Sequence, residues 1–147
     1  MILYHFTRAN LTDRILKQGL TPKADRHGML GGAKSVWLTE RRSLAIPLRE
    51  TLTVMFRSGV YMRRWLFDGV GDGDVVRLSI RVPSDHPLFE YGPWVRKHRR
   101  TVMPDRDNLH YATSLCYGHW ISFEKIPAAW ILGFGRLRRR DLGEISQ

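Results

Sequence analysis

The sequence predicts an α+β domain in which several short strands, one or two helices and long loops build a single core. Three observations lead to this prediction. Residues 75–82 alternate between apolar and polar side chains, which is typical of a strand buried on one face. Residues 2–6 and 36–39 are short apolar runs with the length of strands. Residues 11–18 carry Leu and Ile one helical turn apart and end at Gly19, which indicates a helix.

This first helix is the best-defined local unit in the chain. Thr7 and Asn10 can each cap its start, because their side-chain oxygens can accept hydrogen bonds from unsatisfied backbone N–H groups. Gly19 is suited to the left-handed conformation that commonly ends a helix. Leu20 and Pro22 follow it, as expected for a chain that is leaving a helix.

The remaining elements have weaker local signals. They are, in chain order, a glycine-rich loop at 23–34, a helix from Ser43 to about residue 65, an irregular or partly helical segment at 84–110, and strands at 119–123 and 129–134. No internal repeat or linker is visible in the 147 residues. We therefore expect one domain that spans residues 1–147.

Composition excludes several classes of protein. Hydrophobic residues make up 43% of the chain and aromatic residues 11%, which excludes wholesale disorder. No apolar run approaches the roughly 20 residues of a membrane-spanning helix. Residues 1–5 lack the basic and apolar segments of a secretory leader. A single cysteine, Cys116, excludes a disulfide scaffold and a thiolate-rich zinc site, so we expect a cytoplasmic protein.

The charge of the chain predicts a polyanionic partner, most naturally DNA or RNA. There are 24 Lys and Arg residues against 14 Asp and Glu, which gives a net charge of +10. The residues expected to contact phosphates lie in two basic runs and are Arg96, Lys97, Arg99, Arg100, Arg138 and Arg139. Tyr91 and Trp94, beside the first run, could stack on bases. The alternative is that both runs are solvated surfaces.

Common catalytic motifs do not occur in the sequence. There is no GxSxG, Walker A or HExxH motif, and no glycine-rich dinucleotide turn. Cys116 could pair with His110 or His119 as a nucleophile and base, but a lone cysteine between apolar neighbours is more often buried and inert. The six histidines are scattered without the spacing of metal ligands, so no metal is expected.

A positional pattern remains, in three pieces. The first strand ends in His5-Phe-Thr7, and Ile-Leu-x-x-Gly-Leu-x-Pro22 follows. A Val-Trp37-Leu-Thr39 strand comes about 30 residues later, and Glu124 precedes Ile-Pro and the last strand. This order resembles the ADP-ribosyltransferase fold, in particular the small bacterial branch that includes the DarT DNA ADP-ribosyltransferases and the RNA 2′-phosphotransferases.

The resemblance covers about residues 2–40, 75–82 and 117–134, and the middle of the chain is not matched. It also departs from the family at one point. Active transferases of this fold carry their glutamate at the start of a late strand, and this chain has Gly118 and His119 at that place.

The resemblance implies a small split β-sheet with one or two helices, and NAD-dependent transfer of ADP-ribose to a nucleic acid or a protein. Glu124 would stabilise the oxocarbenium-like transition state, as carboxylates do in glycoside transfer. His5 and Thr7 would hold the NAD, with Trp37 and Thr39 as further cofactor contacts. Ser122 shares a strand face with Glu124 and could orient it.

Each of these residues also has a structural interpretation. Glu124 could be an exposed strand end, His5 a buried structural histidine, Thr7 a helix cap and Trp37 a core residue. The corresponding alternative for the whole protein is a non-enzymatic basic module that holds DNA, RNA or an acidic protein surface. A third hypothesis is transfer of an RNA 2′-phosphate to NAD, although the ordered arginines of that family are not recognisable here.

Overall fold

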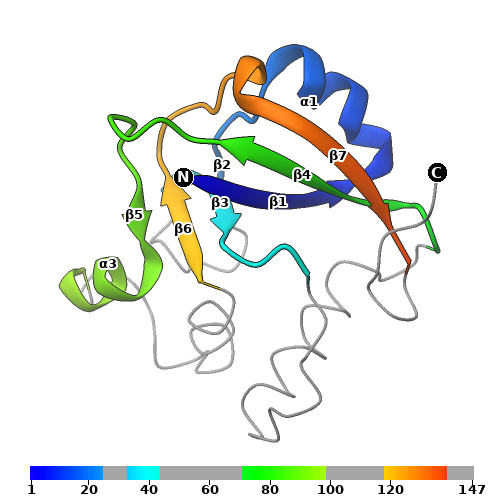
Figure 1. The fold of residues 1–147 in the computed structure, drawn as a ribbon. Helices are drawn as coiled ribbons and strands as arrows, with labels where there is room; N and C mark the ends of the chain where they lie inside the picture. The colour runs from blue at the N-terminus through cyan, green and yellow to red at the C-terminus, as the bar shows by residue number, and fades with distance from the viewer. Residues whose placement is uncertain (25–32, 44–70, 99–117, 139–147) are drawn as a thin grey trace, which may run out of the picture.

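The computed structural model describes residues 1–24, 33–43, 71–98 and 118–138 of the chain, and the structural statements that follow concern these residues. An antiparallel sheet of seven strands is accompanied by two α-helices (Figure 1). The prediction of a mixed α+β fold is therefore confirmed. None of the described helices has the length and apolar character needed to cross a membrane.

The strands are β1 (Ile2–Arg8), β2 (Lys23–Ala24), β3 (Lys34–Thr39), β4 (Val75–Arg81), β5 (Phe89–Glu90), β6 (His119–Ser122) and β7 (Ile131–Leu137). The helices are α1 (Thr12–Gln18) and α3 (Tyr91–Lys97), with single 3-10 turns at Ala9–Leu11 and Ala128–Trp130. The strand order is β5-β6-β3-β1-β4-β7, and β2 pairs with β3 beside this path. The predicted helix that begins at Ser43 lies outside the described residues.

The start of the chain follows its local signals, with one exception. Gly19 ends α1 with a φ of 80°, and its N–H donates to the carbonyl of Ile15 at 2.7 Å. Strand β1 runs two residues further than the apolar run predicts, because Thr7 and Arg8 pair with β4. Thr7 is therefore a strand residue. The predicted side-chain cap is wrong, since neither the 3-10 turn nor α1 has one.

Strand β4 lies inside the sheet, between β1 and β7. The alternation within residues 75–82 correctly predicts the face that packs in the main core. That core contains Leu3, Ile15, Leu20, Val36, Leu38, Val76, Leu78, Ile80, Val82 and Ile126. The opposite face is only partly solvated, since Arg81 is exposed but Arg77 is only 6% exposed. Its guanidinium lies over the ring of Tyr4, 5.6 Å from the centroid, and donates to the carbonyl of Arg42 at 3.1 Å.

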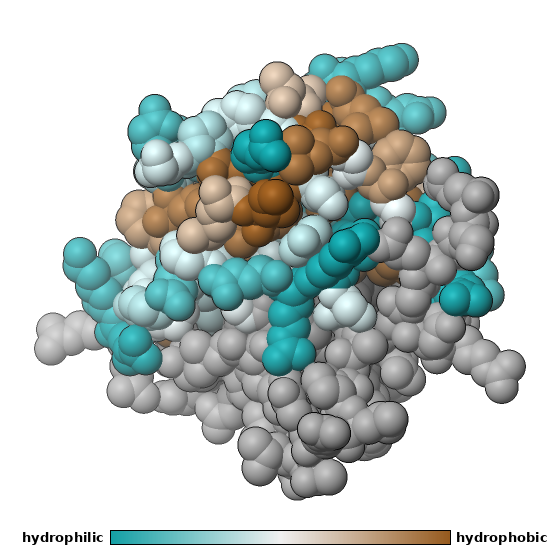
Figure 2. Space-filling model, in the orientation of Figure 1, coloured by the Kyte–Doolittle hydropathy of each residue, from teal (hydrophilic) through white to brown (hydrophobic). Residues whose placement is uncertain are grey.

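The last strand differs from its prediction in position. Residues 128–130 form a 3-10 turn, and β7 continues to Leu137 instead of ending at Phe134. The second basic run spans residues 136–140. Its first residue, Arg136, therefore belongs to the strand and donates to the carbonyl of Gly73 at 3.1 Å. Figure 2 shows hydrophobic side chains gathered over β1, β4 and β7, where Leu132 and Phe134 are exposed.

The sheet has a narrow joint between β1 and β3. Strands β1 and β4 form a continuous ladder of seven Cα pairs, whereas β1 and β3 share only the pair Tyr4–Thr39. The joint separates β5, β6 and β3 from β1, β4 and β7, and Figure 1 shows these two groups of strands running in different directions. A second, smaller core of Tyr91, Val95 and Ile121 lies where α3 packs on β6.

Candidate functional site

His5 lies on β1, immediately after the residue that forms the joint with β3. Its Nδ1 atom is 2.7 Å from the carbonyl oxygen of Trp37. Because a carbonyl oxygen only accepts hydrogen bonds, Nδ1 carries the proton and donates it. In the neutral ring, Nε2 is then left as a hydrogen-bond acceptor.

The surroundings of His5 keep its ring neutral. Desolvation by burial lowers the pKa of His5 below its usual value of 6.5, although the Trp37 carbonyl acts in the opposite direction. The positive charge of Lys23 lowers the pKa further. The half-buried imidazole at neutral pH is therefore a fixed tautomer with an acceptor nitrogen.

The four residues predicted to contact the cofactor lie on two faces of the sheet. His5 and Thr7 are two residues apart on β1 and share one face. Thr39 lies opposite Tyr4, so it takes the other face, and Trp37 shares that face with it. The structure brings together His5 with Thr7, and Trp37 with Thr39. The two pairs are connected through the backbone carbonyl of Trp37.

Trp37 is part of an aromatic cluster. Its ring is 5.0 Å from that of Tyr91 and 5.5 Å from that of His119, measured between centroids. Burial lowers the pKa of His119 to about 4, so this imidazole is neutral as well. Thr39 lies opposite His119 in the ladder, and its hydroxyl accepts the N–H of Arg41 at 3.1 Å. These contacts fit the structural interpretation of Trp37.

Glu124 follows β6 and is exposed. The buried hydroxyl of Ser122 donates to the Glu124 carbonyl at 2.7 Å and accepts the Glu124 N–H at 3.2 Å. Ser122 therefore fixes the main chain of Glu124, and the carboxylate is left to solvent. Within the described residues, no hydrogen bond or ion pair links this carboxylate to His5.

Two polar residues beside the predicted site were missed by sequence reasoning. His86 places Nε2 at 2.8 Å from the Ser122 hydroxyl, and since that hydroxyl gives its proton to Glu124, His86 is the donor. The Glu40 carboxylate accepts the indole N–H of Trp120 at 2.7 Å, at the end of β3. His86 and Ser122 are separated by 36 positions in the sequence, and Glu40 and Trp120 by 80 positions. No local pattern could therefore have indicated these contacts.

The two basic runs lie at different ends of the sheet. Arg96 and Lys97 are exposed in the last turn of α3, which packs beside β5 and β6. Arg138 is exposed just after β7, at the other edge of the sheet (Figure 1). The other three predicted phosphate contacts, Arg99, Arg100 and Arg139, lie outside the described residues. The described members of the two runs therefore lie on two separate surfaces.

A scan against protein-family models finds no matching family, and a search of curated proteins finds no similar sequence. His5 and Thr7 are half-buried on the face of β1 that also carries Leu3 of the main core. His5 can accept a hydrogen bond from a ligand hydroxyl, and Thr7 on the same face can donate or accept one.

Proposed function

We propose that the protein is an NAD-dependent ADP-ribosyltransferase whose acceptor is a nucleic acid or a protein. The observation that carries this proposal is the hydrogen bond from His5 Nδ1 to the Trp37 carbonyl, which leaves Nε2 as an acceptor. A ribose offers hydroxyl groups that can donate to such a nitrogen. Of the residues present, His5 and Thr7 fit a bound ribose, because they share a face of β1.

The remaining predicted residues have distinct proposed roles. Trp37 supplies the carbonyl that holds the His5 ring, and its indole packs against Tyr91. Thr39 lies on the Trp37 face and would contact a ligand only there. Bound NAD would supply the ADP-ribosyl group: the bond from its ribose to nicotinamide breaks, nicotinamide leaves, and a nucleophile of the acceptor bonds to the ribose carbon, on which positive charge develops. Glu124, with its backbone fixed by Ser122, is the proposed carboxylate that stabilises this charge.

A second candidate function is the non-enzymatic basic module. It is favoured by the exposure of the Glu124 carboxylate, which makes no contact with His5 in the described part of the chain. Arg96 and Lys97 are exposed and available to a polyanion. The two candidates differ in a single requirement, since only the transferase needs NAD.

Transfer of label from NAD carrying radioactive phosphate separates the two candidates. The purified protein would meet single-stranded DNA, RNA and a cell lysate in turn. We expect label on one class of acceptor, and loss of that label in Glu124→Gln and in His5→Asn. Asp13→Asn is the control, because Asp13 is an exposed carboxylate on α1, outside both the proposed site and the basic runs. Absence of label on every acceptor, with a folded protein, would contradict the proposal and favour the basic module.

The Glu124 assignment has its own test within the same assay. The Glu40 side chain lies beside Gly118, at the place where the family that the chain resembles carries its glutamate, and the Glu40 N–H donates to the Gly118 carbonyl at 3.1 Å. Label that survives in Glu124→Gln but disappears in Glu40→Gln would keep the transferase and reassign its carboxylate.

A further inference from the structure

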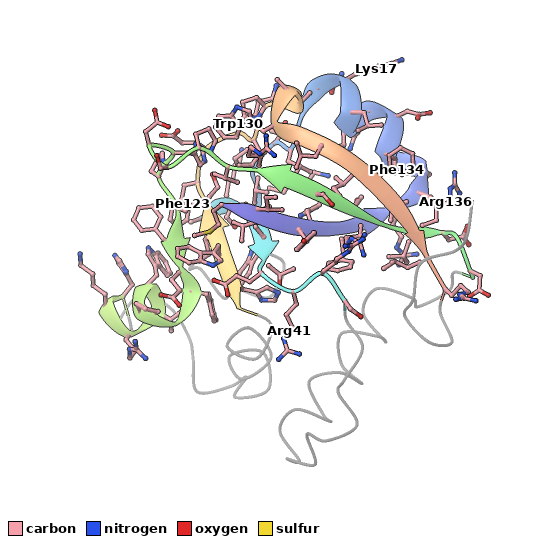
Figure 3. All side chains as sticks on the ribbon, viewed as in Figure 1. Lys17, Arg41, Phe123, Trp130, Phe134 and Arg136 are labelled. Carbon is pink, nitrogen blue, oxygen red and sulfur yellow. The ribbon has the colours of Figure 1, made fainter. Side chains whose placement is uncertain are left out.

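Four ring-bearing residues form a partly accessible layer at the outer edge of the sheet. We call it the aromatic surface, and it consists of Phe89, Trp94, His98 and Phe123. The ring centroids of Phe89 and Phe123 are 5.5 Å apart, and those of Trp94 and Phe123 are 5.6 Å apart. The rings of Trp94 and His98 are stacked, with 4.3 Å between centroids and 20° between planes. Figure 3 shows Phe123 beside β5 and β6.

The aromatic surface lies outside the smaller core. Tyr91, Val95 and Ile121 are buried beneath it, with Trp94 and Phe123 packed against them. Phe89 lies opposite Ile121 on the short edge strand β5, yet its side chain is 41% exposed. The contacts with the smaller core hold Trp94 and Phe123 in place, and the aromatic surface keeps part of its area, above all at Phe89, accessible to a ligand.

Positive charge accompanies these rings. Lys97 comes three residues after Trp94, which makes the two side chains neighbours on the surface of α3. Arg96 and Lys97 are both exposed in the last turn of this helix. Two exposed acidic residues also adjoin the rings in the sequence, Glu90 next to Phe89 and Glu124 next to Phe123, while the whole chain carries +10.

We propose that the aromatic surface binds single-stranded nucleic acid, with unpaired bases stacking on Phe89 and Phe123 and phosphates meeting Arg96 and Lys97. Flat rings beside exposed cations suit a ligand that alternates flat bases with phosphates. An acidic protein surface would use the cations but leave the rings unused, and a duplex keeps its bases stacked inside. If this nucleic acid is also the acceptor of ADP-ribose, the inference rests on the proposed function. Binding of nucleic acid to the aromatic surface does not itself require NAD.

Fluorescence anisotropy with labelled oligonucleotides tests the inference. The probes are oligothymidylate and oligouridylate of about 12 nucleotides, within the usual site size for single strands, and a DNA duplex of equal length. We expect the full-length protein to bind the single strands more tightly than the duplex, with affinity falling as salt rises. A preference for one of the two single strands would identify DNA or RNA as the source of the ligand and support the inference. Equal or tighter binding of the duplex, or no binding at low salt, would overturn it.

Paired variants connect the binding to this surface. Phe89→Ala should weaken binding about tenfold, the range expected for loss of one stacked base. Phe134→Ala is the matched control, because Phe134 is 43% exposed on β7, at the other edge of the sheet (Figure 3). It should leave binding unchanged. Similar affinities for the two variants would overturn the inference.

Charge variants give a second readout that does not depend on the rings. Lys97→Gln should weaken binding to both single strands and lower the salt slope by about one. Glu90→Gln should tighten binding, because it removes the acidic group beside Phe89. Since these assays contain no NAD, oligonucleotide binding without any label transfer would keep the surface and reject the transferase. Label transfer without oligonucleotide binding would keep the transferase and overturn the aromatic surface as a nucleic-acid site.

Discussion

The imidazole of His5 donates from Nδ1 to the carbonyl oxygen of Trp37, 2.7 Å away, across the joint between β1 and β3. The register of the Tyr4–Thr39 pair would set Phe6 opposite Trp37 if the ladder continued, and that pair is not formed. A side chain thus satisfies a carbonyl at the point where the two strands separate. The same bond fixes the His5 tautomer, so sheet geometry and site chemistry depend on one contact.

The close approach of α1 and the segment after β6 predicts that Gly19 cannot be replaced. Gly19 has a φ of 80°, and a Cβ there would collide with the carbonyl oxygen of Ile126. That carbonyl accepts the N–H of Leu20 at 2.9 Å. We expect Gly19→Ala to lower the free energy of unfolding in urea by about 3 kcal/mol or more.

Gly133→Ala is the matched control for this prediction. A Cβ at Gly133 meets no atom within 4 Å, so its effect should stay below about 1 kcal/mol. Equal unfolding free energies for the two variants would contradict the close approach at Gly19.

The hydrogen bonds of Ser122 predict a stability cost for removing its hydroxyl. Ser122 is fully buried and bonds the Glu124 backbone and His86. Ser122→Ala should lower the free energy of unfolding by about 1–3 kcal/mol, because the hydrogen bonds made at this buried position are lost. Ser84→Ala, at an exposed position, should change it by less than about 0.5 kcal/mol. A Ser122→Ala protein as stable as the Ser84→Ala protein would refute the network.

The neutral histidines predict that acid destabilises the fold. Burial lowers the pKa of His119 from 6.5 to about 4. Between these values the unfolded chain binds a proton that the folded chain does not. The free energy of unfolding therefore falls as pH decreases through this window, by up to about 1.4 kcal/mol per pH unit for one proton. His5 contributes in the same direction, because its pKa is lowered too.

Urea unfolding at about pH 7.5 and about pH 5 measures this dependence. The His119→Gln variant should lose part of the slope, since it removes one of the responsible groups. If the unfolding free energy of the wild type stays level or rises when the pH is lowered from about 7.5 to about 5, His119 is not held neutral by burial.

Sequence reasoning succeeded where the signal is local. The apolar run of β1, the glycine at the end of α1 and the alternation along β4 each depend on neighbouring residues. The burial of Arg77 was not predictable in this way, because it follows from the position of β4 between two other strands. Helix α3 is only seven residues long and carries Pro93, so its periodic signal is too short to identify.

The candidate site also combines features that the sequence predicts with features that only the structure shows. The sequence singles out His5 and Trp37, but the relative register of β1 and β3 decides that their side chains take opposite faces. No local pattern encodes that register, because it arises from residues more than 30 positions apart. The aromatic surface is also assembled from separate segments, β5, α3 and the residue after β6. Of its four members, only Trp94 was linked to base stacking from the sequence. The same prediction for Tyr91 is wrong, because Tyr91 is buried in the smaller core.

The most direct test of the central claim is calorimetric titration of NAD into the wild-type protein and into His5→Asn. The asparagine amide can still donate to the Trp37 carbonyl, so the fold is retained, but it lacks an acceptor at the Nε2 position. We predict binding to the wild type and a loss of at least about tenfold in affinity in His5→Asn, the cost of one hydrogen bond to a fixed acceptor. No binding to the wild type, or equal affinity in a folded His5→Asn protein, would contradict the role of His5 in holding NAD.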